Sequence, residues 1–245
     1  MAATPTLRQP RGNQILSALP RKDFAQLRPQ LEPVTLGLKE IIYEPNTPIP
    51  YIYFPNSGVT SILTTMKNGK AVEVGLVGKE GMLGLPVFLG TDRSSGQSFS
   101  QVPGESLRLA ADAFRAAIQQ SRALVDLLHR YTQALFTQVS QSAACNSLHL
   151  IEKRCCRWLL MTQERVEADE FVLTQDLLAV MLGARRASVA EVAGKLQDAG
   201  LIRYRRGRMR ILNRPGLEAA TCECYGVIRT EYERLLPYLT PDGAS

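Results

Sequence analysis

The sequence is poor in histidine, which excludes several kinds of enzyme. Its 245 residues include only two histidines, His129 and His149, and one tryptophan. A cupin-type barrel enzyme binds its metal through several histidines of the barrel strands, and this chain has none before residue 129. It also lacks a glycine-rich nucleotide loop and a histidine near a nucleophile in its first half. We therefore predict that the protein is not an enzyme.

The sequence also lacks a long apolar run. The longest, Leu177 to Ala184, is far below the ~18 residues that a membrane-spanning helix needs. The N-terminal segment MAATPTLRQPRGNQ has no apolar core of the kind found in signal peptides. We expect a soluble, cytoplasmic protein that makes no membrane contact.

Cysteine is present but has no familiar metal-binding spacing. Cys155 and Cys156 are adjacent, and Cys222 and Cys224 are one residue apart, whereas zinc and iron–sulfur motifs usually place two or more residues between ligands. Five cysteines in a chain of this size do not suggest a disulfide scaffold either. We expect no cofactor and no metal, with Cys145, Cys155 and Cys156 as packing residues. A redox role for Cys222 and Cys224 stays open.

Positive charge is concentrated in one segment. The chain has a net charge of +6, and residues 183–214 hold nine basic side chains against Glu191 and Asp198, a local charge of +7. Such a segment favours an anionic partner. The basic residues are Arg185, Arg186, Lys195, Arg203, Arg205, Arg206, Arg208, Arg210 and Arg214.

The first half of the chain has a β pattern. Residues 31–110 contain runs rich in Val, Ile, Thr and Tyr, separated by proline and glycine. Asn68-Gly69 between two such runs is a strong hairpin signal. Several short strands with regular turns predict an all-β barrel or sandwich.

A long helix is expected after this β region. Residues 121–148 contain no proline or glycine, and Leu124, Leu128, Tyr131 and Leu135 follow one another at steps of 4, 3 and 4. A seam of this spacing is typical of a helix that pairs with a second copy of itself. The alternative is a helix that packs on its own domain.

Residues 173–202 predict a helix-turn-helix. Thr174 stands where an N-cap belongs, Gly183 allows the left-handed turn after the first helix, and Gly200 ends the second. Two short strands around the basic turn at 205–208 add a β-wing. In such a unit the start of the second helix enters the major groove, where arginine reads guanine, and a basic turn lies along the phosphates.

This arrangement resembles the Crp/Fnr family of bacterial transcription regulators from about residue 13 to residue 212. The matching positions include Thr174, Ala179, Gly183, Arg186 and Val189. The resemblance implies an α+β fold. Its expected parts are an antiparallel β-roll or jelly-roll sensor domain (13–120), a dimerisation helix (121–148), and a winged helix-turn-helix domain with a C-terminal helix (151–237).

The resemblance also implies DNA-contacting residues. Arg186 would read a base, and Glu191 stands where the family often has arginine, so the target sequence should differ from the best-known family consensus. A carboxylate at 191 can accept from cytosine N4. The predicted DNA-binding residues are Thr174, Gln175, Arg185, Arg186, Ser188, Glu191, Arg205, Arg206 and Arg208.

The sensor half departs from the family pattern. Gly81 and Met82 align with the Gly-Glu of the phosphate-binding cassette, and Arg93 and Ser94 align with its Arg-Ser. A thioether cannot accept hydrogen bonds from a ribose hydroxyl as a carboxylate does. These four residues form the candidate effector site of a degenerate cyclic-nucleotide-like sensor.

Together these features predict a sequence-specific regulator that binds a palindromic site on double-stranded DNA. The resemblance implies a homodimer formed through the helix around Leu124, Leu128, Tyr131 and Leu135, with RNA polymerase as a partner if the protein activates transcription. The alternative is a ligand-binding regulatory subunit whose winged helix mediates protein contacts.

Overall fold

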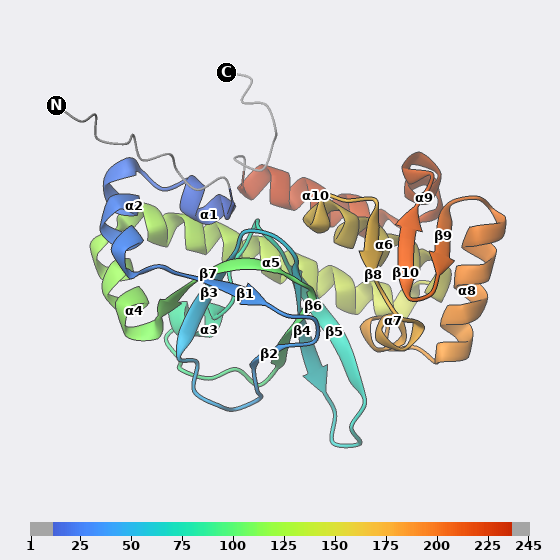
Figure 1. The fold of residues 1–245 in the computed structure, drawn as a ribbon, viewed down its shortest axis with the longest axis horizontal. Coiled ribbons are helices and arrows are strands. Elements are labelled where there is room, and N and C mark those ends of the chain that lie inside the picture. The colour runs from blue at the N-terminus through green and yellow to red at the C-terminus, as the bar shows by residue number, and fades with distance from the viewer. Residues whose placement is uncertain (1–11, 237–245) are drawn as a thin grey trace.

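The computed structural model describes residues 12–236 and has an α+β fold (Figure 1). A β-roll lies beside one long helix, and a winged helix-turn-helix lies near the far end of that helix. Residue 237, the end of the predicted third domain, lies outside the described residues. The division into three domains stays a prediction. Within residues 12–236, no helix is both long and apolar enough to cross a membrane.

The β-roll consists of two antiparallel sheets. Their strand orders are β1-β7-β3 and β2-β6-β4-β5, and the side chains between them include Ile52, Phe54 and Leu76, each buried. The strands are β1 (Glu32–Leu36), β2 (Ile41–Tyr43), β3 (Tyr51–Pro55), β4 (Val59–Thr65), β5 (Ala71–Val77), β6 (Gln97–Val102) and β7 (Gly104–Ala110).

The predicted hairpin joins β4 to β5. Met66 N donates to Lys70 O at 2.8 Å, and Gly69 has a φ of +79°, a conformation that suits glycine. Short helices flank the roll: α1 (Gln14–Ser17), α2 (Arg21–Leu27), the 3-10 turn η1 (Arg28–Gln30), α3 (Leu85–Phe88) and α4 (Ala111–Gln120). The expected β region with its hairpin is confirmed.

The long helix α5 (Arg122–Leu148) packs on the roll of its own chain. Ser121 caps its start by accepting from Leu124 N at 3.1 Å. Tyr131 Oη donates to Met82 O at 3.0 Å, and Gln138 Nε2 donates to Leu76 O at 3.1 Å. This face of α5 is therefore covered by the roll.

The predicted dimer seam is wrong for the four residues that defined it. Leu124, Leu128, Tyr131 and Leu135 are between 0% and 7% exposed within the single chain. The heptad spacing correctly indicates a buried stripe, but the roll of the same chain buries it.

The second half of the chain follows α5. Its three-stranded antiparallel sheet has the order β8-β10-β9, and α10 lies along α5 (Figure 1). The elements are α6 (Ile151–Val166), β8 (Glu170–Val172), α7 (Gln175–Met181), α8 (Arg186–Asp198), β9 (Ile202–Arg205), β10 (Arg208–Ile211), α9 (Arg214–Ala220) and α10 (Glu223–Leu235).

Helix α6 joins the two halves through buried polar contacts. Trp158 Nε1 donates to Glu73 Oε1 at 2.8 Å, and Arg165 Nε donates to Glu80 Oε1 at 2.7 Å. All four side chains are buried. Because a buried ion pair requires good geometry, these contacts fix how the helix-turn-helix half sits on the roll.

Candidate nucleic-acid interface

The helix-turn-helix forms because its caps and apolar spacing agree. Thr174 Oγ1 accepts from Leu177 N at 3.1 Å and caps α7. Leu178 and Ala179 are buried on its inner face. Gly183, with a φ of +56°, then turns the chain, and Ala184 N donates to Ala179 O at 2.9 Å. The turn directs α8 away from α7.

Helix α8 presents a basic start and a buried inner face. Arg185 is its N-cap and Arg186 its first residue, and both are exposed. Val189, Val192 and Leu196 are buried against the rest of the unit. The exposed start of α8 therefore holds two guanidinium groups, the geometry that a recognition helix needs.

The wing is a two-residue hairpin with an arginine-rich outer face. Arg206 and Gly207 have φ values of +52° and +72°, the positive-φ pair of a type I′ turn. Met209 is fully buried between its neighbours. Because side chains alternate along a strand, the arginines share one exposed face: Arg203, Arg205, Arg208 and Arg210.

Two hydrogen bonds bring the wing to the start of α7, and an ion pair brings α8 there too. Leu173 N donates to Gly207 O at 2.8 Å, and Tyr204 Oη donates to Leu173 O at 3.0 Å. Arg186 Nε lies 3.5 Å from Asp176 Oδ1. The sequence-predicted residues of α7, α8 and the wing thus belong to one connected surface.

Some of these charges already have partners. Arg208 pairs with Glu170 at 2.6 Å, and Glu191 pairs with Lys195 at 2.8 Å. The hydrogen bond from Lys195 lowers the pKa of Glu191, so this carboxylate stays ionised. Arg185, Arg205 and Arg206 lie in none of the ion pairs between described residues. These three guanidinium groups are therefore available to a polyanion, as are those of Arg203 and Arg210, which are also exposed and in none of these ion pairs.

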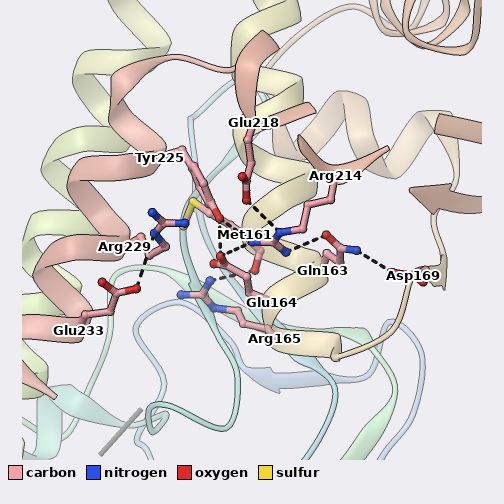
Figure 2. A network of polar contacts seen from close by, with 10 residues as sticks. All are labelled: Met161, Gln163, Glu164, Arg165, Asp169, Arg214, Glu218, Tyr225, Arg229 and Glu233. Carbon is pink, nitrogen blue, oxygen red and sulfur yellow. Dashed lines mark hydrogen bonds and ion pairs between the residues drawn. The ribbon is translucent and has the colours of Figure 1, made fainter. Parts of the chain in front are cut away.

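Arg214, the last basic residue of the segment, has a structural role. Figure 2 shows its guanidinium among the side chains of α6, α9 and α10. It donates to Gln163 Oε1, Glu164 Oε1 and Glu218 Oε1, at 2.8–2.9 Å, and to Tyr225 Oη at 2.7 Å. These contacts hold the three helices together, so Arg214 adds little to the charge available for binding.

The four candidate effector residues lie in two different environments, one buried and one at the surface. Met82 is 1% exposed, and a Cβ at Gly81 would lie 2.5 Å from the Tyr131 ring, so this pair is packed against α5. Arg93 is exposed, and its Nη1 donates to Asn46 O at 2.9 Å. Ser94 Oγ accepts from Gly96 N.

No hydrogen bond or ion pair between described residues joins Gly81 or Met82 to Arg93 or Ser94. The two hollows described on the roll, beside α3 and α4 and beside α2 and α4, are not lined by these residues. A ligand role for them stays a prediction.

Sequence reasoning missed the buried polar contacts across α6. Glu73, Glu80 and Arg165 carry no spacing signal, because their partners lie 85 residues away in the chain. It also missed a cluster of cysteine and histidine where α5 meets α10.

Two family models match the chain. A cyclic nucleotide-binding domain matches residues 33–121, and a Crp-like helix-turn-helix domain matches residues 153–220. The chain belongs to the Crp/Fnr family. This Crp/Fnr protein is a DNA-binding transcription regulator and not an enzyme. No curated protein matches it.

Solved structures show the same fold at low identity. FixK2 from Bradyrhizobium japonicum is 14% identical with a TM-score of 0.68, and covers 78% of this chain and 98% of its own. TTHB099, a CRP-family transcriptional regulator from Thermus thermophilus, is 18% identical with a TM-score of 0.64, and the match covers 76% of this chain and 95% of TTHB099. The c-di-GMP-responsive global regulator CLP of Xanthomonas campestris is 16% identical with a TM-score of 0.62, and the match covers 78% of this chain and 98% of CLP.

Proposed function

We propose that this Crp/Fnr protein binds a two-fold symmetric site on double-stranded DNA as a homodimer. The observation that supports this most strongly is the connected basic surface of α7, α8 and the wing. Arg185 and Arg186 stand at the start of α8, and Arg205 and Arg206 stand at the tip of the wing. Arg186 suits a base edge in the major groove, while Arg185 and the two arginines of the wing suit phosphates.

We propose that other predicted residues position the protein on the duplex. Thr174 and Gln175 stand at the N-terminus of α7, where free backbone N–H groups favour a phosphate. Ser188 lies in the first turn of α8, one turn before Glu191. Glu191 would read cytosine N4 after exchanging its contact with Lys195.

The homodimer we propose uses the exposed face of α5. His129, Gln133, Phe136, Ser140, Ala143 and Ser147 follow one another at steps of 4, 3, 4, 3 and 4. All are exposed, and Phe136 is 66% exposed. This is a second heptad stripe, opposite the one that the roll covers, and an apolar ring at its centre favours pairing.

We propose that the sensor half has lost the cyclic-nucleotide response. The methionine at position 82 is buried under Tyr131 and offers no carboxylate to a ribose. The expected result is that cyclic AMP and cyclic GMP leave the DNA affinity unchanged. We also propose a cytoplasmic location. If the protein activates transcription, we propose RNA polymerase as its partner.

Selection from a randomised duplex pool at ~150 mM salt tests the function. Purified protein without added ligand should enrich a two-fold symmetric site. The proposal would be overturned if no duplex were enriched, with or without cyclic nucleotides, while the protein bound a protein partner. That result would favour a regulatory subunit.

A further inference from the structure

Four potential metal ligands converge where α5 ends and α10 begins. Cys145 lies in the last turn of α5, and His149 is its C-cap. Cys222 is the N-cap of α10, and Cys224 lies in its first turn. The three cysteines are 0–4% exposed and form a small cluster apart from the main core. Sequence spacing concealed this group because Cys145 and Cys222 are 77 residues apart.

Two distances within the cluster match the ligand–ligand spacing of one tetrahedral ion. The ligand atoms of the four residues all lie within 4.8 Å of one another. Cys145 Sγ is 3.6 Å from Cys222 Sγ, and Cys224 Sγ is 3.6 Å from His149 Nδ1. With Zn–S of about 2.3 Å and Zn–N of about 2.0–2.1 Å, two ligands of one tetrahedron lie about 3.6–3.8 Å apart. An iron–sulfur cluster would need its cysteines to surround several irons, for which this cluster is too small.

The histidine has the orientation of a metal ligand with a supporting carboxylate. Its Nδ1 faces the sulfurs, while its Nε2 lies 3.3 Å from Glu223 Oε1. In zinc sites the nitrogen that does not bind metal usually donates to a carboxylate or carbonyl, which fixes the ring. His149 with Glu223 reproduces that arrangement.

The surroundings also suit the charge of such a site. Zinc with three thiolates and a neutral histidine has one net negative charge. Burial raises the pKa of the Cys145 thiol, and the buried Arg157 guanidinium, whose Nε has no hydrogen-bond partner among the described residues, opposes that shift. The N-terminus of α10, where Cys222 and Cys224 stand, further favours thiolates. Three soft sulfur ligands and an imidazole are a set that zinc prefers.

We propose that Cys145, His149, Cys222 and Cys224 form a structural zinc site. The ion would join the end of α5 to the start of α10 and so close the loop of chain that contains α6 to α9. It would thus fix the helix-turn-helix half against the long helix. This proposal does not depend on which DNA the protein binds.

The first test is the metal content of the full-length protein purified in reducing, oxygen-free buffer. We expect about one zinc per chain by elemental analysis. Replacement by Co²⁺ should give intense tetrahedral bands and thiolate-to-cobalt charge transfer. Absence of zinc together with failure to take it up would overturn the proposal. So would iron with labile sulfide, or a Cys145–Cys222 disulfide that persists under these conditions.

Variants separate a zinc site from simple packing. Cys224→Ser and His149→Ala should each reduce bound zinc several-fold. Chelation should lower the thermal unfolding midpoint of the wild-type protein but barely change the midpoints of these two variants. Cys155→Ala, which changes a buried cysteine of α6 outside the cluster, should keep its zinc and its chelator response. Equal zinc content in all these proteins would overturn the proposal. If a variant does not fold, the cobalt spectrum of the wild type still tests whether these ligands bind a metal.

Discussion

Arg186 is the residue whose side chain we expect to read a base. It is exposed at the start of α8, and its nearest carboxylate, Asp176, is 3.5 Å away and exposed as well. Arg186→Ala should therefore weaken binding to the selected site by about 1–3 kcal/mol and relax specificity at one base pair. Titration of the selected duplex and its single-base variants measures both effects.

The matched control is Arg28→Ala. Arg28 is an exposed arginine of η1, beside the roll. Its loss should leave the affinity and the base preference unchanged. If Arg186→Ala weakened random and selected duplexes equally, the base-reading role would be excluded.

Glu73 is a buried carboxyl that should make stability depend on pH. Burial raises its pKa to about 7, against an ordinary value of 4.5. Between these two pH values the folded protein keeps a proton that the unfolded chain releases. Stability should therefore fall as pH rises from about 4.5 to 7, by at most roughly 3 kcal/mol.

Glu73→Gln tests this, because the amide keeps the shape without the titration. Denaturant unfolding at several pH values should show a flatter profile between pH 5 and 7 in the variant. Asp198→Asn, at the exposed end of α8, should retain the wild-type slope in that range. A Glu73→Gln profile that matched the wild type would contradict the raised pKa.

The wing is the element we expect to supply affinity that does not depend on sequence. Arg205 and Arg206 lie in no ion pair among the described residues and stand at the tip of the hairpin. Arg205→Ala should weaken all duplexes similarly and reduce the slope of log K against log salt by about 1. Salt titrations measure this, and an unchanged slope would exclude a phosphate contact.

Helix α5 is the element we expect to join two copies. Phe136→Asp should convert the protein to a monomer, because it places a charge at the centre of the exposed stripe. Sedimentation or light scattering measures the mass. Met66→Asp is the matched control, since Met66 is 60% exposed on the β4–β5 hairpin. A Phe136→Asp protein that stayed dimeric would place the interface elsewhere.

Elements set by local signals were predicted well from the sequence. Thr174 and Gly183 mark the bounds of α7 through capping and turn conformation, both decided by neighbouring residues. The heptad spacing at Leu124 and Tyr131 correctly indicates a buried face of the helix. Periodicity shows that a face is buried, but it does not show which part of the structure buries it. The spacing alone therefore cannot distinguish a stripe covered by a second copy from one covered by the roll of the same chain.

The whole molecule holds the contacts that no local pattern could reveal. Glu73 meets Trp158, and Glu80 meets Arg165, across 85 residues of chain. Cys145 meets Cys222 only because α10 returns along α5. Such groups are brought together by tertiary packing, so their spacing in the sequence is uninformative.

The same buried contacts suggest how a signal would travel through the molecule. The roll holds α6 through Glu73 and Glu80, and α6 is followed by β8 and then by the helix-turn-helix. A change that shifts the roll on α5 would therefore move α8 relative to its copy in a dimer. Because two recognition helices must lie about 34–36 Å apart, a small shift would change affinity.

Hydroxyl-radical footprinting on the selected duplex tests the central claim most directly. Two α8 helices in successive major grooves should protect two stretches related by two-fold symmetry, with centres about 10 base pairs apart. Phe136→Asp should lose the paired protection at concentrations where Met66→Asp keeps it. Protection of a single stretch by the wild-type protein, or uniform protection without symmetry, would contradict a dimer that reads DNA through α8.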